Sequence, residues 1–217
     1  MFVNLIMEDK NMEKLILFDW GNIVESFETG YTLTNAFNDL FKSLGYKEDN
    51  VLSKITKYKI TSIKDMNLLE EAYDEIKKDL NLTGSFKDFV EKYDYYLNKI
   101  DYYTDVRDYE ISLKKYCKIG ILSNLLILDK KRLDKEVGLS NYDYVFLSFE
   151  LGLRKPDIRI YEEVQKRLPF KKENILFIDD KEKNVLKAKE FGWNAEVAKG
   201  TELDKIKRIC NGFLSRW

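Results

Sequence analysis

The sequence contains no histidine, and this absence is the first constraint on its chemistry. Nucleophile pairs of the Ser-His and Cys-His type, histidine metal ligands and histidine proton shuttles are all excluded. Any catalysis must therefore use carboxylates, lysine, hydroxyl groups and a metal ion.

Cysteine, proline and long apolar runs are also scarce. The two cysteines, Cys117 and Cys210, lie far apart, which favours buried reduced thiols over a disulfide framework. With two prolines in 217 residues, long structureless linkers are not expected. Residues 1–12 lack the basic start and long apolar run of a secretory signal, and are expected to be a disordered extension or the product of an early start codon. No stretch is apolar enough to span a membrane, so a soluble, cytoplasmic protein is expected.

Neither sign of charge dominates, because 37 Lys and Arg residues face 38 Asp and Glu residues that are interspersed with them. Such a chain has no strong positive electrostatic field that would attract nucleic acid or an anionic membrane, so neither is expected as a partner. Any phosphate recognition must be local. Hydrophobic residues make up 44% of the sequence, which is typical of a globular protein and does not indicate an oligomeric state.

Short apolar runs bounded by polar turns predict strands buried on both faces. These runs are Leu15–Phe18, Ile119–Leu122, Tyr144–Leu147, Ile175–Ile178 and Ala195–Ala198. Helical periodicity lies between the later runs, over Val106–Tyr116, Asp129–Val137, Pro156–Leu168 and Glu182–Phe191, with Gly192 as the C-cap of the last. This alternation predicts an α/β fold with a doubly wound, Rossmann-like parallel sheet.

The pattern becomes purely helical between Phe27 and Thr104. Apolar residues recur at helical spacing from Leu33 to Leu44 and stop at Gly45. A second helix is expected over Lys64–Leu80, and a third begins after a capping box at Ser85. We predict a core of residues 1–27 and 105–217 with a helical-bundle cap inserted at 28–104. Five tyrosines near the return to the core could line a pocket, although core and surface positions are commoner for tyrosine: 93, 95, 96, 102 and 103.

Polar side chains follow several of the expected strands. Asp19 follows the first strand, at the strand end where open α/β sheets bind ligands. Ser123 and Asn124 follow the second strand and can hydrogen-bond an anionic oxygen. Each of these motifs alone is most simply a turn, so only their combination carries weight.

Two further motifs carry charge. Lys155 precedes Pro156, which is expected at the first helical position, so that the lysine lies beside amides that favour anions. Asp179 and Asp180 follow the fourth strand, and two adjacent carboxylates repel each other unless a cation or hydrogen bonds compensate. Mg²⁺ prefers such oxygen ligands, so a magnesium site is expected here.

The order of these motifs closely resembles that of the haloacid dehalogenase-like hydrolases, across nearly the whole chain. Three sequence motifs look most similar to those of the glucose-1-phosphatase-like subgroup. They are Phe-Asp-x-Gly-Asn, Leu-Gly-Leu-Arg-Lys-Pro and Asp-Asp-x-x-x-Asn, the last of which ends at Asn184. The resemblance implies a type-one helical cap and a Mg²⁺-dependent phosphatase that acts on a small phosphorylated metabolite, with sugar phosphates as one candidate class.

The resemblance also implies roles for individual residues. The catalytic residues would be Asp19 as covalent nucleophile, with Ser123 and Lys155. Phosphate-binding residues would be Asn22, Ser123, Asn124 and Lys155. Metal ligands would be Asp19, the main-chain carbonyl of Gly21 and Asp180. Asp179 would either share the metal ion or act on the site through a hydrogen bond.

Gly21 departs from the family pattern, because most phosphatases of this family carry an aspartate there that protonates the leaving group. Asn22 cannot replace that acid, and Glu25 is the nearby carboxylate along the chain. We therefore expect turnover either to favour a good leaving group, such as an anomeric, acyl or aryl phosphate, or to rely on water for protonation of the leaving group.

Two alternatives remain open. A haloacid dehalogenase would also use Asp19 and also lacks the second aspartate, but Asp179 and Asp180 would repel a departing halide unless a cation were present. A non-catalytic phosphometabolite-binding protein of the same fold is the other alternative, since a fold does not guarantee activity.

Overall fold

The computed structural model describes residues 14–21, 23, 25–26, 31–136 and 138–216. In this part of the chain a five-stranded parallel sheet forms the centre of the larger lobe, in the order β5-β4-β1-β6-β7. The strands are β1 Leu15–Phe18, β4 Lys118–Ser123, β5 Tyr144–Leu147, β6 Ile175–Asp179 and β7 Asn194–Val197. The chain builds outward from β1 on one side and then on the other, so the sheet is doubly wound with β1 at its centre.

The central strand is buried on both faces. All four residues of β1 have no exposed surface, and each has parallel partners on β4 and on β6. Because side chains alternate across a strand, Ile16 and Phe18 join the hydrophobic cluster on one face, whereas Leu15 and Leu17 join the cluster on the other. This explains why the run is continuously apolar instead of alternating.

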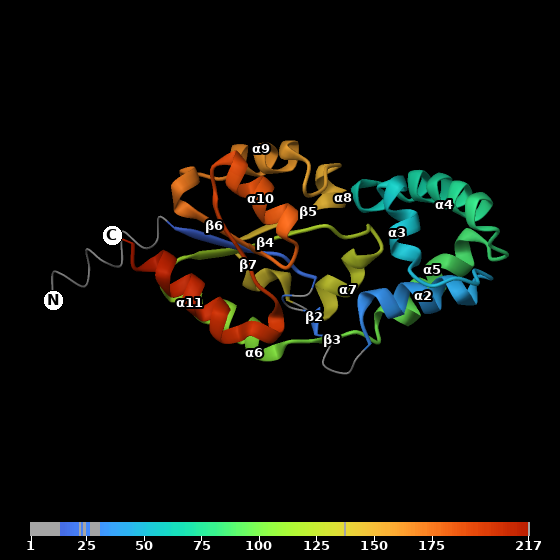
Figure 1. The fold of residues 1–217 in the computed structure, drawn as a ribbon, viewed down its shortest axis with the longest axis horizontal. Coiled ribbons are helices and arrows are strands. Elements are labelled where there is room, and N and C mark those ends of the chain that lie inside the picture. Colours follow the sequence, from blue (N-terminus) through green and yellow to red (C-terminus); the bar gives the residue numbers. More distant parts are fainter. Residues whose placement is uncertain (1–13, 22, 24, 27–30, 137, 217) are drawn as a thin grey trace.

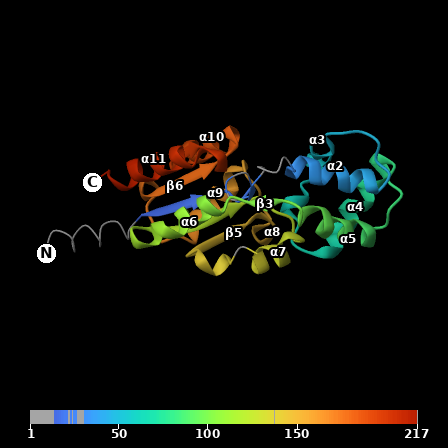
Figure 2. The same ribbon diagram turned by 90° about the horizontal axis from the view of Figure 1, so that it is seen from below.

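Helices cover both faces of the sheet (Figure 1). Helices α9 (Ile158–Lys166) and α10 (Glu182–Phe191) lie on the face of Leu15 and Leu17. On the opposite face lie α6 (Thr104–Ser112), α7 (Asp129–Glu136) and α11 (Leu203–Leu214). A short helix, α8 (Ser148–Leu151), follows β5 directly. Figure 2, viewed from below, shows α6 in front of the strands and α11 along one side of the same lobe.

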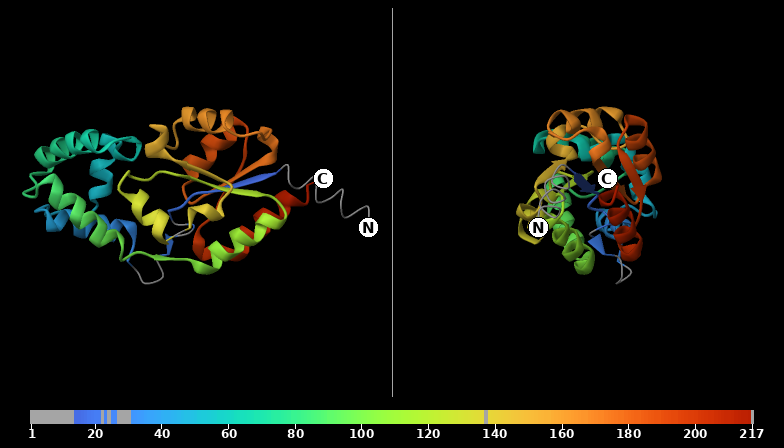
Figure 3. Two further views of the ribbon diagram at one scale, coloured as in Figure 1. Left: turned by 180° about the vertical axis from the view of Figure 1, so that it is seen from behind. Right: turned by 90° about the vertical axis from the view of Figure 1, so that its left-hand side faces the viewer.

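A second lobe of helices lies beyond one end of the sheet (Figure 3). It consists of α2 (Leu33–Ser43), α3 (Val51–Ile55), α4 (Met66–Leu80) and α5 (Phe86–Leu97). These helices enclose a hydrophobic cluster of their own, centred on Phe41, Tyr73 and Phe89. Two short antiparallel strands, β2 (Glu25–Ser26) and β3 (Asp101–Tyr102), pair where the chain passes between the lobes. We call the helical lobe the cap.

The predicted α/β fold with its parallel sheet and helical insert is confirmed. The Ser85 capping box is present, and Gly192 ends α10 at φ 107°. The predicted boundaries of the cap at residues 28 and 104 stay predictions, and the expectation for residues 1–12 lies outside the described residues. None of the helices in the described ranges has the length and apolarity needed to cross a membrane.

Other expectations are corrected. Pro156 is not the first helical residue, because α9 begins at Ile158 and Asp157 is its N-cap, with the side chain accepting from the amide of Arg159. Lys155 therefore lies in a loop and not beside the first amides of a helix. The short helix α3 and the β2–β3 ribbon were not predicted, since their runs are too short to give a clear period. The C-terminal helix α11 was also not predicted, although its buried residues Ile206, Cys210 and Phe213 recur at helical spacing.

Candidate active site

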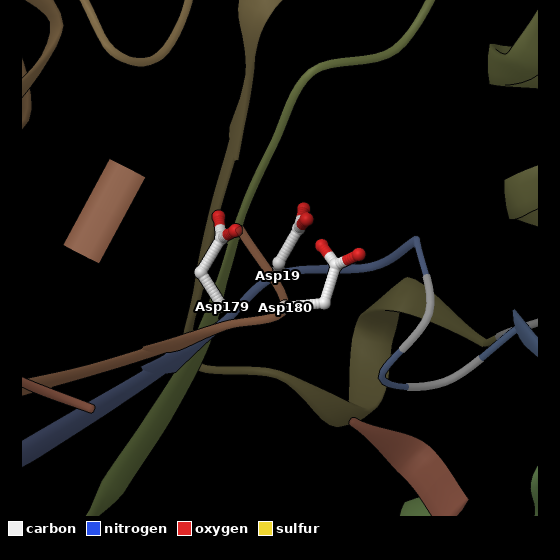
Figure 4. Close-up of side chains that lie close together, drawn as sticks. All are labelled: Asp19, Asp179 and Asp180. Carbon is white, nitrogen blue, oxygen red and sulfur yellow. The ribbon is translucent and has the colours of Figure 1, made fainter. Parts of the chain in front are cut away.

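Three adjacent parallel strands place acidic or hydroxyl side chains at one edge of the sheet. Asp19 follows β1, Ser123 ends β4 and Asp179 ends β6. The amide of Asp19 donates to the carbonyl of Ile178 at 2.8 Å, which extends the β1–β6 pairing to the carboxylate. Figure 4 shows the carboxylates of Asp19, Asp179 and Asp180 gathered at these strand ends. The topological switch at β1 thus creates the site.

The carboxylate of Asp19 is oriented mainly through one oxygen. Its Oδ1 accepts from Ser123 Oγ at 2.7 Å and from the Trp20 amide at 2.8 Å, and lies 2.9 Å from Lys155 Nζ. No residue in the described part of the chain donates to Oδ2. Burial alone would raise the pKa of Asp19, but the charges of Lys155 and Lys181 with the Ser123 hydrogen bond hold it below its usual value. Asp19 is therefore ionised at neutral pH.

Lys155 bridges the two buried carboxylates. Its Nζ donates to Asp179 Oδ2 at 2.6 Å and to the Leu122 carbonyl at 2.7 Å, besides its contact with Asp19. Burial opposes the charge of this ammonium group, yet the charges of Asp179 and Asp19 raise its pKa above the usual value. Lys155 is thus a fully buried cation whose position is defined on three sides.

Asn124 positions the lysine loop. Its Nδ2 donates to the carbonyl of Lys155, and its Oδ1 accepts from the amide of Lys155, both at 2.9 Å. This paired contact resembles a strand pairing and fixes the main chain from which the lysine extends. The role of Asn124 as a phosphate ligand stays a prediction.

Asp179 and Asp180 differ in how strongly they are engaged. Asp179 accepts from the Lys181 amide at 2.8 Å, from Asn184 Nδ2 at 3.0 and 2.9 Å, and from Lys155. Burial and the nearby charge of Asp19 raise its pKa, although Lys155 opposes this. The Asp180 side chain is 7% exposed, and its Oδ1 lies 3.9 Å from Lys181 Nζ.

The three carboxylates can share one cation. Each of Asp19, Asp179 and Asp180 offers an oxygen atom, and these three oxygens lie within 4.8 Å of one another. Oxygen ligands at this spacing suit Mg²⁺, which binds one or two carboxylates and completes its octahedron with substrate oxygens and water. The donor set therefore fits the metal that the sequence predicts.

A pocket of about 260 Å³ opens above Asp19, between the sheet edge and the cap. Its wall on the core side includes Ser123, Asn124 and Lys155, and Gly21 also lines it. Basic side chains add positive charge: Arg132, Arg154, Lys181 and Lys183. The cap contributes residues of α2, α3 and α5. A phosphate placed in this pocket would meet Asp19 at its base.

The carboxylates that line this pocket, among the described residues, are Asp19 and Asp129. Asp129 belongs to a buried network: its Oδ1 accepts from Tyr93 Oη at 3.0 Å and Arg132 Nη2 at 3.1 Å, and its Oδ2 accepts from the Leu126 amide at 2.9 Å. A carboxylate that only accepts hydrogen bonds is not poised to donate a proton. The prediction for Asn22 lies outside the described residues, as does the side chain of Glu25.

Most of the predicted site residues lie together, from Asp19 through Ser123, Asn124 and Lys155 to the two aspartates. Their exact roles in binding and catalysis stay predictions. The sequence reasoning missed the Tyr93–Asp129–Arg132 network, because no motif relates residues on a cap helix to those on α7. Of the five candidate tyrosines, Tyr93 lines the pocket, whereas Tyr95 is exposed and Tyr103 is in the core.

Comparison with known proteins gives a consistent result. A family model described as haloacid dehalogenase-like hydrolase matches residues 16–198. Over 51 residues the chain is 39% identical to the sesquiterpene phosphatase astK of Aspergillus oryzae, a match that covers 24% of this chain and 26% of that protein. The matched part is thus about a quarter of the curated relative.

Solved structures share the fold across most of the chain. A mutant of a HAD family enzyme from Bacteroides thetaiotaomicron, in complex with magnesium and inorganic phosphate, superposes with a TM-score of 0.68 at 21% identity, covering 87% of this chain and 95% of that one. L-2-haloacid dehalogenase from Xanthobacter autotrophicus, with chloropropionic acid covalently bound, gives 0.59 at 18% identity, covering 84% and 76%. At these identities the similarity shows the fold alone.

Proposed function

Because the chain belongs to the haloacid dehalogenase-like hydrolases, we propose that it is a Mg²⁺-dependent phosphatase of a small phosphorylated metabolite with Asp19 as its covalent nucleophile. One observation carries the proposal: the ionised Asp19 lies 2.9 Å from the buried Lys155 ammonium and shares a 4.8 Å cluster with Asp179 and Asp180, beneath a basic pocket. This arrangement combines a nucleophile, a fixed cation and a site for a divalent cation.

Asp19 would attack phosphorus through Oδ2, since its other oxygen is held by Ser123, Lys155 and the Trp20 amide. The bond from phosphorus to the ester oxygen breaks as the new bond forms, and the leaving group departs with the electron pair. Water then hydrolyses the aspartyl phosphate and regenerates Asp19. Lys155 balances the negative charge of the transition state from a fixed position, which costs no reorganisation.

Asp19, Asp180 and the carbonyl of Gly21 would hold the metal ion. Asp179 is already engaged by Lys155, Asn184 and the Lys181 amide, so we assign it to positioning the lysine. When bound, Mg²⁺ would supply the positive charge that allows a phosphate dianion to approach the Asp19 carboxylate.

Ser123 and Asn124 would have different roles in the site. The single hydroxyl proton of Ser123 is donated to Asp19, so its first role is to orient the nucleophile. Asn124 would act by holding the main chain of Lys155. Membership of the glucose-1-phosphatase-like subgroup with a type-one cap stays a prediction, supported by the insertion of the helices between β1 and β4.

Dehalogenation is the second candidate, because the fold also matches a haloacid dehalogenase. The buried Asp179 beside Asp19 is unfavourable for it. Asp19 loses its charge as the ester forms, but the departing halide would still lie close to the carboxylates of Asp179 and Asp180. We therefore favour phosphate esters.

The proposal is tested with a panel of phosphate esters at saturating MgCl₂ and in EDTA. We expect Mg²⁺-dependent release of phosphate by the wild type and a loss of at least ~10³-fold in Asp19→Asn, which keeps the shape but not the charge. Asp157→Asn is the matched control, because this partly exposed aspartate is an N-cap outside the pocket and asparagine also caps helices. Phosphate release that persists in Asp19→Asn would rule out the nucleophile.

A further inference from the structure

The pocket above Asp19 has two chemically different halves. The half formed by the core carries the phosphate-directed groups Asp19, Ser123 and Lys155. The half formed by the cap is mostly apolar: Leu33, Phe37, Leu52, Ile55 and Ile60. Leu125 and Leu126 extend this surface from the loop after β4. A ligand that fills the pocket therefore needs an anionic end and an apolar end.

An aromatic pair forms part of the apolar half. Phe37 of α2 and Tyr93 of α5 both line the pocket, and their rings meet edge to face with centroids 5.8 Å apart. Tyr93 is fixed by its hydrogen bond to Asp129, at 3.0 Å across the boundary between cap and core. Such a wall can accept a further ring in an edge-to-face or offset contact.

Polar partners for a leaving group are few on the cap side. The Tyr93 hydroxyl donates to Asp129, and the Thr56 hydroxyl donates to the Leu52 carbonyl at 2.7 Å. Thr61 Oγ1 is a buried oxygen with no hydrogen-bond partner in the described part of the chain. A sugar would bring several hydroxyls into this half, and each buried hydroxyl without a partner is unfavourable. A ring with a single polar substituent suits the surface better.

The described part of the pocket wall also lacks a carboxylic acid that could protonate the leaving group. Position 21 is glycine, and Asp129 accepts three hydrogen bonds, including one from the Arg132 guanidinium. In the described part of the pocket wall, no carboxyl group is therefore placed to donate a proton. Without a carboxylic acid, a leaving group that is stable as an anion, such as a phenolate, is favoured over an alkoxide.

We propose that the substrate is the phosphate monoester of a small aromatic hydroxyl compound, and that Phe37 and its apolar neighbours in the cap select the ring. This inference rests on the proposed function of the Asp19 site, shown in Figure 4. The bond between phosphorus and the phenolic oxygen breaks, the phenolate leaves with the electron pair and takes its proton from water, and phosphorus bonds to Asp19. A cavity of about 260 Å³ limits the aromatic part to a small ring system.

The leaving group is tested first. With MgCl₂ present, kcat/KM is measured for 4-nitrophenyl, phenyl and benzyl phosphate and for glucose 1-phosphate. Phenyl and benzyl phosphate carry the same ring but leave as phenolate and alkoxide. We expect phenyl phosphate to be favoured over benzyl phosphate by about 10²-fold, the lower end of the usual contribution of a general acid. Glucose 1-phosphate should be a poorer substrate than phenyl phosphate by a similar or larger factor.

The cap residues are tested with a matched pair of variants. Phe37→Leu removes a ring from the pocket wall, whereas Phe41→Leu makes the same change one helical turn away, where Phe41 is buried in the cap and does not line the pocket. We expect Phe37→Leu to raise KM for phenyl phosphate about three- to tenfold and to leave the inhibition constant of inorganic phosphate unchanged. Phe41→Leu should change neither value.

The outcomes separate the two proposals. Turnover of benzyl phosphate or glucose 1-phosphate equal to that of phenyl phosphate, lost in Asp19→Asn, would retain the phosphatase and overturn the aromatic substrate. The same conclusion follows if Phe37→Leu and Phe41→Leu behave alike. If the wild type hydrolysed none of the esters in the panel, both the proposed function and this inference would be overturned.

Discussion

At the scale of single residues, two adjacent aspartates have the same side chain but different surroundings. Asp179 is fully buried and accepts from Lys155 and Asn184, whereas Asp180 is partly exposed and has a long 3.9 Å contact with Lys181. Burial raises the pKa of Asp179 above its usual value. The sequence could not distinguish these two residues, because the difference comes from the opposite directions in which their side chains point at the end of β6.

This difference predicts two distinct defects. Asp180→Asn should raise the Mg²⁺ concentration needed for half-maximal activity by at least ~10-fold, since it removes a charged metal ligand. Asp179→Asn should lower kcat mainly, because it weakens the hold on Lys155. The measurement is a Mg²⁺ titration of initial rates for each variant beside the wild type. If Asp179→Asn showed the larger change in Mg²⁺ requirement, the assignment of the two residues would be reversed.

Glu110 is a buried acid that does not line the pocket. It has no exposed surface, and its Oε2 accepts from Tyr142 Oη at 2.7 Å. Burial raises its pKa from 4.5 to about 8, although the Tyr142 hydrogen bond opposes this. Between these values the folded chain keeps a proton that the unfolded chain loses. The free energy of unfolding should therefore fall with rising pH, by at most ~1.4 kcal/mol per pH unit from this group.

Replacing Glu110 with glutamine removes this dependence. The amide oxygen can still accept from Tyr142, but the side chain no longer loses a proton. We expect the stability of Glu110→Gln relative to the wild type to increase as the pH rises from about 4.5 to about 8 and then to level off. Urea unfolding across this range provides the measurement. A constant difference between the two proteins would show that Glu110 has an ordinary pKa.

At the scale of elements, local signals define the ends of helices well. Ser85 Oγ accepts from the Asp88 amide at 3.1 Å, and Asp88 accepts from the Ser85 amide at 2.7 Å, which together form the capping box of α5. The aspartate also complements the positive end of the helix dipole. Ser85 is exposed and Asp88 is partly exposed, so a change at Ser85 measures the contribution of the capping box with little change in packing.

Ser85→Ala should therefore lower the free energy of unfolding by about 1 kcal/mol. Ser112→Ala is a suitable comparison, because Ser112 is also exposed and its hydroxyl donates to the Tyr109 carbonyl near the end of α6, where it caps no amide. The control should change stability by less than half as much. Equal effects in urea denaturation would mean that the capping box adds no stability beyond that of any surface serine.

At the scale of the whole molecule, the chain contains separate hydrophobic clusters for its two lobes. In the cap, Phe89 packs against Tyr73 with ring centroids 5.0 Å apart and against Phe41 at 6.0 Å. In the sheet lobe, the clusters lie on the two faces of β1. Two kinds of contact connect the lobes: Leu126, from the loop after β4, packs into the cap cluster, and Tyr93 of the cap donates a hydrogen bond to Asp129. We therefore expect the cap to open locally while the sheet stays folded.

Phe89→Ala tests this expectation. The cavity should destabilise the cap by about 3–5 kcal/mol. Hydrogen exchange should then accelerate at the amides of α2, α4 and α5 and stay unchanged in β4 and β6. Phe177→Ala, in the cluster under α9 and α10, should have the opposite distribution. Equal acceleration in both lobes would show that cap and core unfold as one unit.

The sequence by itself determined the strands of the core, the order of the polar motifs that follow them and the helical insert, because those signals are local. A short, continuously apolar run such as Leu15–Phe18, bounded by polar turns, favours a strand in the middle of a sheet, and Asp19 then lies at the strand end. Motif order along the chain was sufficient to group Asp19, Lys155 and Asp180.

Only the tertiary structure decided what each of these groups contacts. The pocket wall brings Phe37 of the cap close to Asp19 of the core, and the Tyr93–Asp129 hydrogen bond joins two residues that are 36 positions apart in the sequence. Helical periodicity shows that Phe37 faces inward but not which cavity it meets, since that depends on how the cap packs against the sheet edge. Contacts between distant segments, unlike local periodicity, have no signature in a single sequence.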